Sequence, residues 1–224
     1  MTGRSRVTSV VLLAACLSAL RASAGDVQIG LGVREALRVS VERALSRVAR
    51  SGGFADNPAL RISLPDQLQG MDTAMRLAGE QKRVDRFIAS LSQAAESSAA
   101  STRPVLLTAV SEMPIDGARL LMAGDTGCTE ALRRYAYGRV IAVLDPAVVD
   151  AMELGRVTRR YRKLNRDLPG GMLSPPPSFD LDAYVVGRTA DGIFLAISQE
   201  ERRIRTDPAA RTSPLLREVF GAHR

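Results

Sequence analysis

The chain has 224 residues, enough for one domain with a sizeable core. Hydrophobic residues make up 46% of it, but aromatic residues only 4%, and tryptophan is absent. Leucine, valine, isoleucine, alanine and methionine must therefore fill the core, which favours helices packed on helices. The formal net charge is +7, and almost all the positive charge is arginine, because Lys82 and Lys163 are the only lysines.

The N-terminus has the pattern of an export signal. Arg4 and Arg6 precede an apolar run, Val10 to Leu20, that is too short to span a bilayer. Ala22-Ser23-Ala24 follows with the small-x-small pattern of a cleavage site. The sequence predicts a signal peptide over residues 1–24, cleavage after Ala24 and a periplasmic protein. A second interpretation is a membrane-anchored lipoprotein, because Leu13-Ala14-Ala15-Cys16 matches a bacterial lipobox and would leave Cys16 lipidated.

Cleavage after Ala24 changes the charge and the thiol count. Three arginines and no acidic residue are lost, so the formal charge falls from +7 to +4. Cys128 becomes the only thiol and no internal disulfide can form. We expect Cys128 to be a buried, passive thiol. With His223 as the only histidine, a Ser-His-Asp unit and a zinc site of histidine and cysteine ligands are excluded.

The first half of the mature chain predicts helices separated by glycine and proline. Residues 27–50 repeat apolar side chains on one helix face, and Ser51-Gly52-Gly53 ends the pattern. A connector over 54–64 leads to a second helix that begins at Pro65. Gly79 separates it from a third helix, and Pro104 opens another over 105–113. The apolar face of the first of these helices consists of Val33, Leu37, Val41, Ala44, Leu45 and Val48.

The second half continues in the same way. Asp125 or Thr126 is expected to cap a helix, and Asp145-Pro146 is expected to start the next one, which runs to about Leu168. Residues 169–178 are rich in proline and glycine and predict a loop. Asp180 or Asp182 caps a long helix, and Ser213-Pro214 starts a short last one before a tail over 222–224. The apolar face of the long helix consists of Val186, Ala190, Ile193, Ile197 and Ile204.

No stretch shows sustained alternation of period two. The sequence therefore predicts an all-α fold without a sheet. Residues 25–221 form a single-domain bundle of about seven or eight helices.

The most suggestive binding surface is the cationic segment 155–166. Its positions place the cations on one side of a helix, opposite Val157, Tyr161 and Leu164. Such a face could contact an anionic membrane surface or an acidic envelope protein; a merely solvated face is the other interpretation. Nucleic acid is not expected, because no recognition motif accompanies the charge. The cations are Arg156, Arg159, Arg160, Arg162, Lys163 and Arg166.

The long C-terminal helix carries a second group of candidates on its polar side. Tyr184, Arg188, Asp191 and Arg202 form an outer stripe, in which Arg188 and Asp191 have the spacing of an ion pair. A carboxylate-based hydrolase would use Asp191 with Glu200 or Glu201, near Arg188 or Arg211. The competing interpretation is that Glu200 and Glu201 pair with nearby arginines on a solvated face. No metal site, catalytic residue or cofactor is predicted.

Several passages resemble one family of exported bacterial proteins. They are D-L-D-x-Y-V from residue 180, D-G-I-F-L-x-I-x-x-E-E from 191 and I-R-x-D-P-A-A-R-T-S from 204. Shorter matches are G-F-A-D-N-P at 53–58, R-I-S-L-P at 61–65 and G-D-T at 124–126. The chain thereby resembles the family called domain of unknown function 4197 over about residues 31–221. The resemblance implies an all-helical envelope protein with a signal peptide or lipoprotein signal, and no assigned activity or ligand.

Three functions are thus compatible with the sequence. The first is a non-catalytic envelope protein that binds anionic lipid, glycolipid or a protein partner. The second is a carrier that encloses a small apolar ligand between its helices. The third is the carboxylate-based hydrolase. No transmembrane segment is expected in the mature chain.

Overall fold

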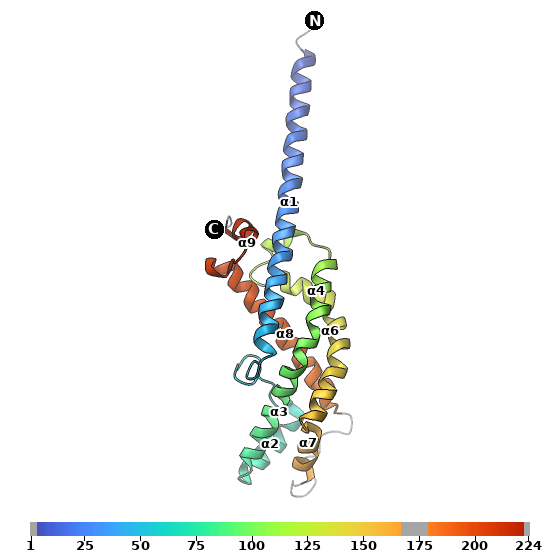
Figure 1. Cartoon of the computed structure of the whole chain (residues 1–224), viewed down its shortest axis with the longest axis vertical. Coiled ribbons are helices and arrows are strands. Elements are labelled where there is room, and N and C mark those ends of the chain that lie inside the picture. Colours follow the sequence, from blue (N-terminus) through green and yellow to red (C-terminus); the bar gives the residue numbers. More distant parts are fainter. Residues whose placement is uncertain (1–3, 167–178, 222–224) are drawn as a thin grey trace.

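The computed structural model describes residues 4–166 and 179–221, and in these ranges the chain is helical and contains no strand. The all-α prediction is confirmed. The helices, shown in Figure 1, are α1 (Arg4–Val48), α2 (Gln69–Leu77), α3 (Gln81–Ala99), α4 (Arg103–Glu112), α5 (Gly117–Met122), α6 (Gly127–Leu154), α7 (Val157–Arg166), α8 (Leu181–Thr206) and α9 (Pro214–Gly221). The predicted loop over 169–178 and the tail over 222–224 lie outside the described residues.

The core is formed where α8 packs against both α1 and α6. The two apolar faces predicted for α1 and α8 are buried; in α1, for example, Val33, Val41 and Val48 are fully inaccessible. Helix α6 adds a third buried row at a spacing of four residues, Val140, Leu144, Val148 and Met152. Gly192 of α8 lets the segment after α1 pack closely on this helix, since a Cβ atom at this position would lie 2.5 Å from the ring of Phe54.

One predicted helix boundary is wrong. Pro146 lies inside α6, which continues to Leu154, and does not begin a new helix. A proline removes one backbone hydrogen bond, but the buried row of α6 continues on both sides of it, so packing outweighs the local signal. The chain breaks later, at Gly155 and Arg156, where Arg156 has a φ of 54° in the left-handed region. This turn sets the direction of α7.

Two further sequence signals agree with the structure, and one expected cap does not form. Helix α1 ends before Gly52, whose φ of 79° belongs to the conformation that glycine tolerates best. The Asp180 side chain caps α8 by accepting a hydrogen bond from the backbone N–H of Ala183 at 2.9 Å. Thr126 occupies the position before α6, but its side chain makes no capping bond.

The molecule is elongated, and its two ends differ (Figure 1). The first half of α1 projects beyond one end, while α2, α7 and the start of α3 form the other. Within the described ranges, no helix is both long and apolar enough to cross a membrane.

Candidate anion-binding site

Helix α7 joins the bundle through a narrow apolar side. Val157 is fully buried, and the ring of Tyr161, one turn further on, stacks against Phe87 of α3 with a centroid distance of 5.8 Å. Arg86 immediately precedes Phe87, and Arg160 immediately precedes Tyr161. The ring stack therefore fixes α3 beside α7 and brings flanking cations of both helices to the surface between them.

These cations line a hollow of about 210 Å³. Its lining consists of Arg83 and Arg86 from α3 and of Arg160 and Lys163 from α7. Each helix contributes two residues three positions apart, which lie on the same face of a helix. Four positive side chains thus surround one small space.

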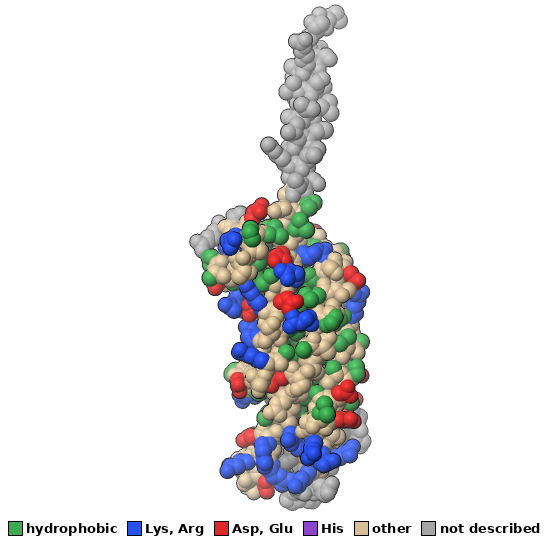
Figure 2. Space-filling model, viewed as in Figure 1, with side chains coloured by type: hydrophobic (Ala, Val, Ile, Leu, Met, Phe, Trp, Pro, Cys, Tyr) green, Lys and Arg blue, Asp and Glu red, His purple; other side chains and the backbone are tan. Residues whose placement is uncertain are grey.

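A second, wider hollow of about 700 Å³ lies along α7 and the end of α6. Arg156, Arg159, Arg162 and Lys163 contribute to its lining, together with Met152, Glu153 and Thr158. Lys163 lines both hollows. We call the two hollows and their cations the basic end. Figure 2 shows Lys and Arg side chains gathered around this end of the molecule.

Few carboxylates of the described residues balance this charge. Among the described residues, none of Arg156, Arg159, Arg160, Arg162 and Lys163 forms an ion pair. Arg86 donates to the backbone oxygen of Lys82, at 3.1 Å. Arg83 has Glu80 at 3.6 Å, and Asp85 pairs with Arg76. The basic end therefore has a local excess of positive charge that an anion would neutralise.

The residues of the outer stripe predicted on α8 contact different parts of the fold. The Tyr184 hydroxyl donates to the backbone oxygen of Ser63 at 2.9 Å. Asp191 accepts from Arg133 at 2.5 Å and from the Tyr137 hydroxyl at 3.2 Å, both on α6, and not from Arg188 as its spacing suggested. Arg202 lies 3.9 Å from Asp125. Three of the four residues hold α8 to neighbouring segments.

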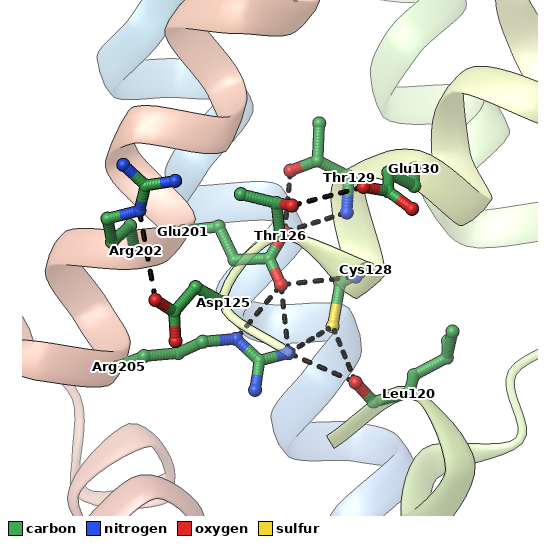
Figure 3. Close-up of polar contacts among 9 residues, drawn as sticks. All are labelled: Leu120, Asp125, Thr126, Cys128, Thr129, Glu130, Glu201, Arg202 and Arg205. Atoms are coloured by element: carbon green, nitrogen blue, oxygen red, sulfur yellow. Dashed lines mark hydrogen bonds and ion pairs between the residues drawn. The ribbon is translucent and has the colours of Figure 1, made fainter. Parts of the chain in front are cut away.

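Glu201 was expected on a solvated face and is instead almost fully buried, with 1% of its surface exposed. Figure 3 shows its carboxylate at the start of α6. It accepts hydrogen bonds from the backbone N–H groups of Cys128 and Thr129 at 3.1 and 2.7 Å, and from the Thr129 hydroxyl at 2.6 Å. Unpaired N–H groups at a helix start attract negative charge. Glu201 therefore caps α6 from another helix.

Arg205 completes this group, which we call the Glu201 cluster (Glu201, Arg205, Cys128 and Thr129). The guanidinium of Arg205 donates to Glu201 at 2.9 and 3.0 Å and to the backbone oxygen of Leu120 at 3.1 Å. It also lies 3.2 Å from the Cys128 sulfur (Figure 3). Burial, strengthened by the charge of Glu201, raises the pKa of the Cys128 thiol to about 12, although Arg205 partly opposes this. Cys128 is thus protonated at neutral pH, in agreement with a passive thiol.

Glu200 is also buried and pairs elsewhere. Its carboxylate accepts from Arg47 of α1 at 2.8 Å, and Arg203 lies 3.5 Å away. The three carboxylates of the hydrolase hypothesis therefore bind different partners: Asp191 contacts Arg133, Glu200 contacts Arg47, and Glu201 contacts the start of α6. They do not converge on one cleft. Among the described residues, no group of three or more His, Cys, Asp or Glu side chains is arranged to hold a metal ion.

The passages that resemble a known family also have structural roles at the end of α8. Asp207 accepts from the backbone N–H of Ala209 and begins a short 3-10 turn, Pro208–Ala210. Arg211 donates to the backbone oxygens of Ile204 and Arg205 at 2.9 and 2.8 Å, which satisfies carbonyl groups left free at the helix end.

Comparison with known proteins supports the family resemblance of the sequence. The model of a family described as "Protein of unknown function (DUF4197)" matches residues 23–221. The chain belongs to this family. No curated protein and no solved structure matches it. Residues of the DUF4197 passages in α8 thus form buried ion pairs and helix caps. These passages therefore have a structural role.

The cations of α3 in the basic end were missed by the sequence analysis. Arg83 and Arg86 show the same signal as Arg160 and Lys163, two cations three residues apart beside an aromatic residue. The sequence does not show the ring contact between Phe87 and Tyr161. This contact places the cations of α3 and of α7 around one hollow in this DUF4197 protein.

Proposed function

We propose that this DUF4197 protein is an exported, non-catalytic binding module of the bacterial envelope, and that its basic end binds the phosphate groups of anionic lipids. The observation that carries the proposal is the hollow between α3 and α7, which Arg83, Arg86, Arg160 and Lys163 line. Arginine side chains bind phosphate oxygens through parallel N–H donors, and lysine adds a mobile point charge.

The form of the molecule supports contact with a surface. The basic end lies at one extremity of an elongated bundle, so a flat membrane could approach the molecule end-on (Figures 1 and 2). Each cation near an anionic leaflet contributes about 1 kcal/mol to attraction, and several act together here. Leu154, 86% exposed, ends α6 just before Arg156 and would add an apolar contact with lipid.

The two other functions have weaker support. The hydrolase needs two carboxylates in one cleft, and its candidates are engaged in separate ion pairs or caps. The carrier needs an apolar cavity. A hollow of about 450 Å³ beside α2 and α3 has Ile88 and Ala89 in its wall, but charged side chains line it as well, among them Arg61, Arg76 and Asp85. That lining does not favour an apolar ligand.

Vesicle co-sedimentation tests the binding function. The processed chain is mixed with vesicles of neutral phosphatidylcholine, and with the same vesicles containing anionic phosphatidylglycerol. We expect sedimentation only with the anionic vesicles, and less of it as salt increases. The double variant Arg86→Gln/Arg160→Gln should lose most of the binding. Arg50→Gln/Arg134→Gln, which removes two exposed arginines outside the basic end, should retain it. Equal sedimentation with neutral vesicles, or none with either, would refute the proposal.

Export is tested on the protein recovered from cells that express the full sequence. Simple processing gives an N-terminus at Gly25 and a periplasmic protein. Lipidation gives a membrane fraction whose first residue is an acylated Cys16. An unprocessed chain in the cytoplasm would contradict both alternatives.

A further inference from the structure

We propose that the two hollows of the basic end form one site for a diphosphate group, in which Lys163 bridges the two phosphates. This inference rests on the proposed function, because it specifies the anion that the basic end selects. Its starting observation is that Lys163 lines both the 210 Å³ hollow and the 700 Å³ hollow.

The two hollows differ in size and lining. The smaller one is bounded by four cations, and its volume corresponds to about seven water molecules at about 30 Å³ each, which suits one phosphate group with a few waters. The wider hollow adds the hydroxyl of Thr158, the buried Met152 and the exposed Glu153 to its arginines. It has room for a second phosphate and part of an organic substituent.

Lys163 is suited to the bridging position. It lies three residues after Arg160 and four residues after Arg159, so it shares a helix face with one cation of each hollow. Its ammonium group has three donors, which can contact oxygens of two adjacent phosphates at once. The planar fork of an arginine fits one oxyanion at a time. A single lysine between two groups of arginines thus matches two phosphates joined by one oxygen.

Glu153 refines the class of ligand. Its carboxylate accepts hydrogen bonds from hydroxyl groups. A diphosphate ester, with its two phosphates on the cations and a hydroxyl-bearing substituent toward Glu153, would use this acceptor as well. A diphosphate also carries more negative charge than a single phosphate, so it gains more from the excess of cations.

Calorimetry with inorganic phosphate and with pyrophosphate tests the inference on the processed chain. We expect pyrophosphate to bind about 10-fold or more tightly than phosphate, because it alone reaches both groups of cations. Lys163→Ala should remove that preference. Arg86→Gln should weaken both anions to a similar extent, since it affects the smaller hollow only. The Arg50→Gln/Arg134→Gln control should bind like the parent chain, and circular dichroism should show all variants folded.

The outcomes separate this inference from the proposed function. Equal affinity for phosphate and pyrophosphate, or a Lys163→Ala variant that keeps the preference, overturns the bridged site even if anionic vesicles still bind. A pyrophosphate preference without vesicle binding overturns the lipid-surface function and leaves the site. Adding pyrophosphate to vesicle-bound protein distinguishes the sources: release supports a lipid phosphate in the same site, whereas bound pyrophosphate without release supports a free diphosphate.

Discussion

The Glu201 cluster and the basic end use arginine in opposite ways. In the cluster, Arg205 is nearly enclosed and its guanidinium has a carboxylate, a carbonyl oxygen and a sulfur as partners. At the basic end, Arg159, Arg160 and Arg162 are exposed and have no ion-pair partner among the described residues. The first arrangement stabilises the fold. The second leaves charge available and is the one that indicates binding.

The comparison also separates two kinds of sequence signal. Two members of the cluster, Glu201 and Arg205, lie in passages that carry the family resemblance, while Cys128 and Thr129 closely follow G-D-T at 124–126. The basic end lies outside those passages. A recognisable family pattern can therefore mark a packing contact, while the proposed binding surface is found from the clustering of cations on α3 and α7.

The largest expected effect comes from breaking the cluster. Glu201→Gln removes the charge opposite Arg205 and one acceptor of the α6 cap, which leaves a buried guanidinium uncompensated. We expect the free energy of unfolding to fall by about 3–5 kcal/mol. Urea denaturation measures it. Glu130→Gln, at an exposed position of α6, should change stability by less than about 0.5 kcal/mol. A similarly small loss for Glu201→Gln would mean that the cluster is not a stabilising element.

The pKa of Cys128 gives the next effect. An unfolded thiol titrates near 8.5, whereas the folded pKa is about 12. The folded state therefore retains the proton as pH rises, and the stability that is present below about pH 8.5 is lost progressively toward pH 12. Near pH 10 the loss should be roughly 2 kcal/mol. Denaturation curves of the parent chain and of Cys128→Ala, measured between pH 7 and 10, should diverge by this amount. Parallel curves would show that the thiol is not protected.

The sequence predicted those parts of the fold that depend on local pattern. Helical periodicity identified the buried faces of α1 and α8, and the cap at Asp180 follows from side-chain chemistry over three residues. It failed at Pro146, where a proline signal was read as a helix start although the buried row of α6 extends through it.

The site was harder to predict because its contacts join distant segments. Glu201 meets Cys128 and Thr129, which precede it by 73 and 72 residues, so its burial is not visible in the charged run around it. The cations of α7 were predicted as a surface from helical spacing alone. Their partners on α3, Arg83 and Arg86, depend on a ring contact that only the tertiary structure provides.

The turn before α7 allows a test at the basic end itself. Arg156 has a φ of 54°, a conformation that costs a residue with a Cβ atom roughly 1–2 kcal/mol. Arg156→Gly should therefore raise the free energy of unfolding by about 1 kcal/mol. Arg159→Gly, inside α7, should lower it by about the same amount. Thermal denaturation of the two variants compares them directly. If both variants lose stability, the left-handed conformation of Arg156 does not destabilise the folded chain.

The smallest effect concerns Asp182, at the start of α8. Burial raises its pKa, and the negative charges of Asp180, Asp145 and Glu153 raise it further. A carboxyl group whose folded pKa is raised retains its proton in the folded state. Its contribution to stability is therefore fully present below the unfolded pKa near 3.9 and is lost as pH rises through the folded pKa.

Asp182→Asn removes this repulsion, and at neutral pH the variant should equal or exceed the parent in stability by a few tenths of a kcal/mol. Its advantage should shrink as pH falls toward 4, because the parent carboxyl then takes up its proton. Urea denaturation from pH 4 to 7 measures the difference, with Asp150→Asn as a matched removal of one exposed charge. An advantage that grows as pH falls would show that Asp182 is stabilised as an anion by the start of α8.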